Sequence, residues 1–277
     1  MTFATAEVSA HKKAIKPRDR SHDIADDLKG DWLDNDPFLT TFFNTLSVTF
    51  PVGEKFFIDS VRHYRSDITD PKLLDDIRGF CGQEGFHRRE HQRYNNALSH
   101  ARGYDLDKLE NSMTRRLTWA QKRMPPLTNL AVTVAIEHFT AVLAERLLSE
   151  DSLINSASPA MRELWRWHAA EEMEHKAVAF DVFKQMGGTD KSRRRAMRRT
   201  TFFLTLELTK GVCYMLKKDG NLFNLSIWRQ GLKKLFGKQG FFAHTWQPYK
   251  EFYADDFHPW QQDSSHLLTE WEASTTG

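Results

Sequence analysis

Two short strings, Gln83-Glu84-Gly85-Phe86-His87 and Glu171-Glu172-Met173-Glu174-His175, repeat a Glu-x-x-His pattern. Each follows a glutamate far upstream: Glu54 lies 30 residues before Glu84, and Glu137 lies 35 residues before Glu172. One copy carries little information, because both residue types are common on helix surfaces. Two copies at similar spacing are typical of a four-helix bundle, in which two helices each give one Glu and two each give a Glu-x-x-His. The pattern therefore predicts an all-α fold.

The stretches around these residues have the composition and spacing of helices. A short apolar helix is predicted over 38–50, stopped by Pro51, and a second over 53–64, where Glu54 shares a face with apolar residues. Further helices are predicted over residues 72–99, 106–122, 127–150 and 160–186, bounded by Pro, Gly and Asp signals. No run alternates as a strand does. The four helices that carry the pattern follow each other in the order Glu, Glu-x-x-His, Glu, Glu-x-x-His.

Composition changes along the chain divide it into four parts. Residues 1–36 mix Lys, Arg and His with small residues and are predicted to be a flexible leader without a secretory signal. Residues 37–188 are predicted to form the metal-binding bundle. Residues 189–260 begin with basic clusters and end rich in aromatics, so we expect a C-terminal helical appendage packed on the bundle. Residues 261–277 are expected to be a loose tail.

The overall composition limits the function classes. Of 277 residues, 40% are hydrophobic and 27% are charged, as in a soluble globular protein. The net charge of +2 gives no general attraction to nucleic acid. Cys81 and Cys213 form no disulfide framework, which favours the cytoplasm. No apolar run approaches eighteen residues, so no transmembrane span is predicted, while peripheral membrane contact of residues 191–218 stays open.

The repeated pattern predicts a site for two metal ions. On a helix, Glu84 and His87 are one turn apart and about 60° around the axis, close enough to bind the same ion. Four buried carboxylates without cations would repel one another and be costly to desolvate. Carboxylate and imidazole donors suit iron first, with manganese and zinc as alternatives. The predicted ligands are Glu54, Glu84, His87, Glu137, Glu172 and His175.

Several neighbouring residues extend this prediction. His91 lies seven residues after Glu84, and His168 lies four before Glu172, so both can face the site. They are extra ligands, partners of the ligands or proton carriers, and the sequence leaves this open. Glu145 is an alternative or an addition to Glu137. Other acidic and histidine side chains fall off the ligand face; the acids are expected to be solvated or to support the ligands, and the histidines not to bind metal: Glu90, Glu171, Glu174, His63, His100 and His138.

The strings that carry these residues resemble a bacterial group described as predicted metal-dependent hydrolases, which is related to ferritin-like proteins. The resemblance rests on residues 50–57, 83–91, 137–141 and 167–176 and runs over about 37–260. It implies a ferritin-like bundle with a metal-dependent hydrolase activity. In similar proteins the helix after Asp190 is more continuously apolar, whereas here Glu207 and Lys210 interrupt it.

Three functions fit these observations. We prefer an oxygen-activating oxidoreductase with a di-iron centre, because a carboxylate-rich ligand set suits that chemistry. The alternative is a hydrolase, in which two metal ions lower the pKa of a bound water. The third is an iron-oxidising or iron-sensing protein, which the long chain with its extra helices disfavours. The substrate is expected to be a small molecule, and the 20 Phe and 8 Trp are compatible with an apolar or lipid-like one.

Overall fold

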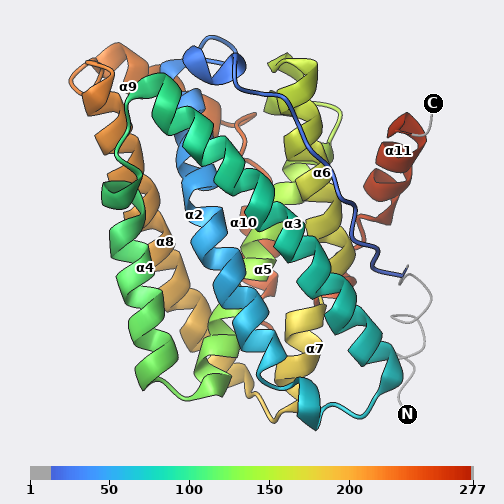
Figure 1. The fold of residues 1–277 in the computed structure, drawn as a ribbon. Helices are drawn as coiled ribbons and strands as arrows, with labels where there is room; N and C mark the ends of the chain where they lie inside the picture. The colour runs from blue at the N-terminus through green and yellow to red at the C-terminus, as the bar shows by residue number, and fades with distance from the viewer. Residues whose placement is uncertain (1–13, 276–277) are drawn as a thin grey trace.

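A computed structural model describes residues 14–275, and every regular element within them is helical (Figure 1). The all-α prediction is confirmed. The helices are α2 (Pro37–Arg62), α3 (Pro71–Arg102), α4 (Leu106–Arg123), α5 (Pro126–Leu148), α6 (Pro159–His175), α7 (Val178–Gln185), α8 (Asp190–Lys218), α9 (Leu225–Phe236), α10 (Trp246–Glu251) and α11 (Ser265–Thr275). Short 3-10 turns lie at Asp27–Lys29, Arg65–Asp67, Leu153–Ser156 and Pro259–Gln261.

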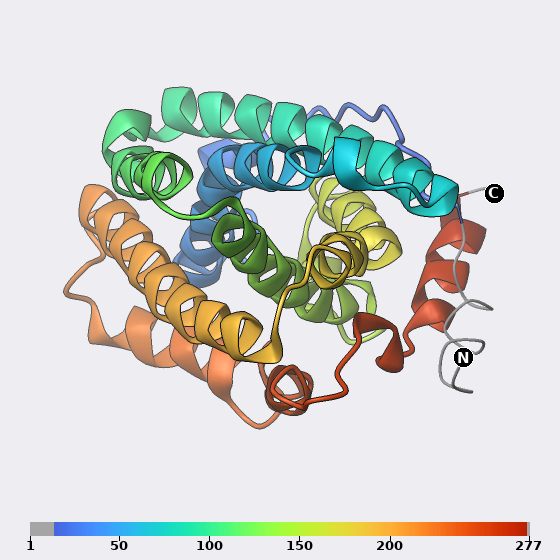
Figure 2. The same cartoon turned by 90° about the horizontal axis from the view of Figure 1, so that it is seen from below.

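Helix α5 lies in the middle of the bundle, with the other long helices around it (Figure 2). Among the described residues it is the helix long and apolar enough, by length and composition alone, to cross a membrane. About 61% of its most apolar stretch is buried inside the protein, as in a core helix. Its inward carboxylate, Glu137, is therefore surrounded by protein on all sides.

Helix α2 runs unbroken through Pro51, so the predicted stop before this residue is wrong. Pro51 cannot donate to the carbonyl of Ser47 one turn earlier, a loss that ordinarily breaks a helix. Here the side-chain Nδ2 of Asn95, on α3, donates to that carbonyl at 3.1 Å. A neighbouring helix thus replaces the missing hydrogen bond, and both halves of α2 bury an apolar face.

The predicted single helix over 160–186 is divided into α6 and α7. The break follows directly after His175, at Lys176 and Ala177. Lys176 is 5% exposed, and its Nζ donates to the carbonyl of Gln262 at 2.6 Å. The end of α6 is thus tied to the C-terminal part of the chain.

The expected flexible leader is an ordered strap where the structure describes it. Residues 14–36 cross α3 and α6 (Figure 1), whereas residues 1–13 lie outside the described part. A Cβ on Gly79 would stand 2.6 Å from the carbonyl oxygen of Ile15, and one on Gly82 would stand 2.4 Å from the Pro17 ring. These two glycines let the strap approach α3. The strap is held by burial of Ile15, Ile24, Leu28, Trp32 and Leu33.

The C-terminal residues also differ from the prediction. Residues 265–275, expected to be loose, form α11 and bury Leu268 and Trp271. The Arg18 guanidinium of the strap lies 5.2 Å from the Trp271 ring centroid, a cation–π contact. The strap and α11 therefore pack together beside α6, while residues 276–277 lie outside the described part.

Candidate metal centre

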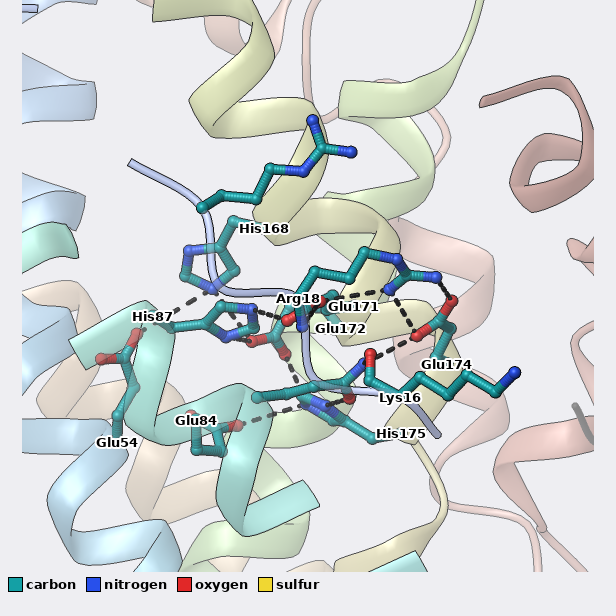
Figure 3. A network of polar contacts seen from close by, with 12 residues as sticks. Lys16, Arg18, Glu54, Glu84, His87, His168, Glu171, Glu172, Glu174 and His175 are labelled. Atoms are coloured by element: carbon teal, nitrogen blue, oxygen red, sulfur yellow. Dashed lines mark hydrogen bonds and ion pairs between the residues drawn. The ribbon is translucent and has the colours of Figure 1, made fainter. Parts of the chain in front are cut away.

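The fold brings the six predicted ligand residues together in the centre of the bundle, and Figure 3 labels all of them except Glu137. They come from four helices: Glu54 from α2, the first Glu-x-x-His from α3, Glu137 from α5 and the second Glu-x-x-His from α6. None of the six is more than 3% exposed. Charged side chains are rarely buried this fully unless they pair or bind a cation. The donor atoms separate into two neighbouring clusters.

The first cluster, called here the His175 cluster, holds three carboxylates and one imidazole, and its donor atoms lie within 4.8 Å of one another: Glu84, Glu137, Glu172 and His175. The His175 Nε2 lies 3.2 Å from Glu84 Oε1, 3.3 Å from Glu137 Oε2 and 3.4 Å from Glu172 Oε2. Three oxygens and one nitrogen around a common point are a fitting donor set for one divalent ion.

The second cluster, called here the His87 cluster, holds Glu54, His87 and His168. The Nε2 of His168 lies 4.0 Å from Glu54 Oε1, and the two imidazole rings stack at 4.0 Å between centroids. Glu172 is a member of the His175 cluster that also faces the His87 cluster, because its Oε1 lies 3.0 Å from His168 Nε2 and 3.5 Å from His87 Nδ1, while its Oε2 faces His175. Its two oxygens could therefore serve ions at both positions.

A chain of hydrogen bonds fixes which nitrogen of His168 carries the proton. The Ser47 hydroxyl donates to Asn95 Oδ1 at 2.8 Å, so Ser47 Oγ accepts from His91 Nδ1 at 2.9 Å. His91 Nε2 then accepts from His168 Nδ1 at 2.7 Å. The Nε2 lone pair of His168 is left facing the Glu172 carboxylate. Two acceptors 3.0 Å apart need a cation between them.

Of the roles that the sequence left open for His91, the structure favours that of a partner, whereas Glu145 does not join Glu137 at the site. His91 supports His168 and is outside both clusters. Glu145 is also outside both clusters, half-buried, and its charge acts on Lys176. His138 binds the carbonyl of Pro248 at 3.1 Å, and burial lowers its pKa to about 3. Its assignment as a non-ligand agrees with this geometry.

The carboxylates of Glu171 and Glu174 are buried and support the imidazoles from outside. Glu171 Oε2 lies 3.0 Å from His87 Nε2, although the angle is poor for a hydrogen bond. Gln83 Oε1 accepts from His175 Nδ1 at 2.9 Å, and Gln83 Nε2 donates to Glu174 Oε2 at 2.7 Å. Of the two roles that the sequence allowed for these acids, the structure places them in the supporting one.

Arg18 of the strap joins the two supporting carboxylates. Its Nη1 donates to Glu171 Oε1 at 3.1 Å and to Glu174 Oε2 at 2.9 Å, and its Nη2 donates to Glu174 Oε1 at 2.5 Å (Figure 3). Its backbone N–H also donates to Glu171. The sequence does not point to Arg18, because the composition of residues 1–36 predicts a flexible leader. The one signal was the pair of small positions, Gly79 and Gly82, on the helix that the strap crosses.

The charge balance of the side chains favours bound cations. Burial, followed by repulsion from Glu84, raises the pKa of Glu54 well above its usual value, and burial raises that of Glu137 to about 8. Burial disfavours a charged His87, but the adjacent carboxylates of Glu171 and Glu172 raise its pKa to about 10. Without metal, the protein must hold protons where ions would otherwise sit. Both carboxylate oxygens of Glu54, Glu84 and Glu137 lack a hydrogen-bond partner, as expected for metal ligands.

Beside the clusters lies a small void of about 30 Å³. His168 and Glu172 line it on the site's side, and aromatic and aliphatic side chains line the rest, among them Phe50, Leu143 and Trp165. A void of this size holds a small reactant such as a water or a diatomic molecule, and most of its wall is apolar.

Comparison with known proteins gives one match. No curated protein and no solved structure matches the chain. Residues 16–263 match the family described as predicted metal-dependent hydrolase, so the chain belongs to that family. The matched region begins in the strap and ends before α11, and it includes every residue of both clusters.

Proposed function

We propose that this protein is a dinuclear metal enzyme, and that it activates oxygen to oxidise a small organic substrate. One observation carries the preference for oxygen chemistry. The void that His168 and Glu172 line has a volume of about 30 Å³ and mostly apolar walls, which suit a diatomic gas better than the body of an ester or amide. The donor set of four carboxylates and three imidazoles suits iron, with manganese next.

Two ions held here would supply electron transfer to oxygen and a strong local positive charge. The protein's own residues hold the two positions. Glu172 faces both of them, Glu54 belongs to the His87 cluster and Glu137 belongs to the His175 cluster. Phe50 and Trp165, packed on His91 and His168, keep bulk water away from the imidazoles.

Arg18 and Gln83 orient the ligands from the outer side. Gln83 accepts from His175 Nδ1, which directs the Nε2 lone pair of this imidazole into its cluster. Burial opposes ionisation of Glu171, but His87 and, after it, Arg18 lower its pKa and so keep it ionised next to His87. The proton of each imidazole is thus held at a defined nitrogen, ready for a metal on the other.

Hydrolysis is the second candidate, and membership of the predicted metal-dependent hydrolase family favours it. In that case two ions would lower the pKa of a water in the void, and the substrate bond would have to reach it from outside. The pocket beside His168 and Glu172 would then need to widen when substrate binds.

Loading the metal-free protein with ferrous iron and then admitting air separates these functions. The oxygen-activating proposal predicts stoichiometric oxygen consumption, read with an oxygen electrode, together with the near-ultraviolet absorption of carboxylate-bound ferric iron. The same assay on Glu172→Ala controls for free iron. A protein that consumes no oxygen with iron, and that with zinc cleaves ester or phosphate test substrates, would reverse the choice in favour of the hydrolase.

A further inference from the structure

A second and much larger cavity lies between α4, α5 and α8, and no residue of either metal cluster lines it. Its volume of about 520 Å³ falls within the usual range for small-molecule sites. Its walls are mainly aliphatic and aromatic, from Met113 and Leu117 on α4, Val132 and Ile136 on α5, and Phe203 and Leu204 on α8. We call it the α4–α5–α8 cavity.

The walls leave apolar surface in contact with water. Helix α4 buries none of its residues, and Trp119 at its end is 58% exposed. Phe203 on the opposite wall is 38% exposed. Apolar surface left in water costs about 25 cal/mol per Å² relative to burial, and contiguous patches of it usually mark a binding site. The cavity therefore has the properties of a site for an apolar chain.

Three cations line the same cavity at one end of α8. Lys191, Arg195 and Arg199 are spaced four residues apart, so they follow one face of the helix. All three are exposed, and none makes a hydrogen bond or an ion pair with residues 14–275 that the structure describes. Like charges at this spacing destabilise a helix, and cations near its N-terminus oppose the helix dipole.

Neighbouring arginines on α8 show that this lack of partners is specific to the cavity side. Arg193 is fully buried and binds Asp190 and the backbone carbonyl of Ala254 at 2.7 Å. Arg194 forms an ion pair with Asp255. The structure thus divides the basic run into arginines that bind the C-terminal segment and cations that face the cavity.

The cavity has one acidic residue, and that residue is already neutralised. Glu207 is 6% exposed, accepts from Arg116 at 2.8 Å and also accepts from Ser112. It ties α4 to α8 and so holds two of the walls together. The lining thus has four cations (Arg116, Lys191, Arg195, Arg199) and one carboxylate, a net charge of +3 (four minus one).

We infer that the α4–α5–α8 cavity binds a long-chain fatty acid, with the chain between the three helices and the carboxylate at Lys191, Arg195 and Arg199. A single apolar chain matches the walls, and one anionic head supplies the missing partner of the cations. This binding does not depend on the reaction proposed for the metal centre, and it is measured without turnover.

Calorimetric titration with palmitate below its micelle concentration tests the inference, with hexadecanol as the uncharged ligand of equal chain length. We expect palmitate to bind with a Kd in about the micromolar range and hexadecanol to bind about tenfold more weakly. Arg195→Gln combined with Arg199→Gln should weaken palmitate binding about tenfold. Arg198→Gln, an exposed charge on the same helix that does not line the cavity, should leave it unchanged.

A change in the walls gives an independent readout. Val132→Phe, at a half-buried position, should weaken both ligands by filling the cavity, and circular dichroism checks that the variant is folded. The inference is overturned if palmitate does not bind. It is also overturned if neither the Arg195→Gln/Arg199→Gln double variant nor Val132→Phe changes the affinity for palmitate. It is also overturned if the protein binds only phosphatidylglycerol vesicles, or if Val132→Phe changes only the oligomeric state in gel filtration. Those results would assign the face to a membrane surface or to a second copy of the chain.

Discussion

The two metal clusters are built from the same repeated pattern, yet their surroundings make them chemically unequal. The His175 cluster has three carboxylates and one imidazole, whereas the His87 cluster has one carboxylate and two imidazoles. The outer partner of His175 is the neutral amide of Gln83, and that of His87 is the carboxylate of Glu171. A repeated motif thus fixes where ligands stand, and residues outside the motif decide what each position prefers to bind.

Removing the residue shared by both clusters should have the largest effect. Glu172→Ala takes away the one carboxylate that faces both imidazole groups, so we expect nearly all bound metal to be lost from both positions. Elemental analysis after gel filtration measures this, and Glu172→Gln, which keeps the shape, controls for collapse of the site. The matched control is Glu145→Ala on α5, which should retain its metal. Full occupancy in Glu172→Ala would remove the basis of the assignment.

Changing one imidazole in each cluster should separate the two positions. His168→Ala is expected to lose the ion of the His87 cluster and keep the other, while His175→Ala does the reverse. With a chromophoric metal such as cobalt, visible absorption should show two different sites disappearing in the two variants. If His168→Ala binds as much metal as the unaltered chain, His168 is only a partner of His91, and the clusters are less unequal than the structure indicates.

The outer partners should have smaller effects of the same selective kind. Glu171→Gln removes the negative charge beside His87 and should weaken its metal about 10- to 100-fold, with the other position nearly unchanged. Gln83→Leu should act on the His175 metal instead. Competition with a chelator of known affinity measures both. Equal weakening of both ions by either variant would show that the clusters respond as one unit.

The smallest expected effect is on the stability of the metal-free protein. The pKa of Glu137 is raised to about 8 and that of His87 to about 10, both above the values in an unfolded chain. From about pH 6.5 to 8 the folded state therefore holds more protons than the unfolded state, so its stability falls as pH rises. We expect Tm to drop by several degrees over this window in the metal-free protein. Bound metal, which displaces these protons, should flatten the slope. A metal-free Tm that rises over the same window contradicts the described protonation.

The convergence of the six ligand residues could be predicted because it follows from local spacing. A Glu and a His three residues apart share a helix face in any helix, and the two helices with this pair and the two with a single Glu each bury one face. The place of His168 could not be derived in this way. The hydrogen bonds from His168 Nδ1 through His91 and Ser47 to Asn95 orient this imidazole, and they depend on how α2, α3 and α6 pack.

The errors along the chain have a common physical cause. Pro51 reads as a helix stop because local rules count only the hydrogen bond it lacks, and the replacement comes from Asn95, 44 residues later. Residues 14–36 are predicted to be flexible because their composition is mainly polar, yet a few apolar side chains such as Leu28 and Trp32 are buried and hold the segment in place. In both cases distant tertiary contacts outweighed local propensity.

The central claim, two unequal metal positions in one chain, is tested most directly by titrating the metal-free protein with ferrous iron under argon in a calorimeter. We predict two ions bound per chain, in two steps of different affinity and heat. Binding of a single ion, or of none, would contradict the account, and two ions bound in one indistinguishable step would contradict the inequality of the His175 and His87 clusters.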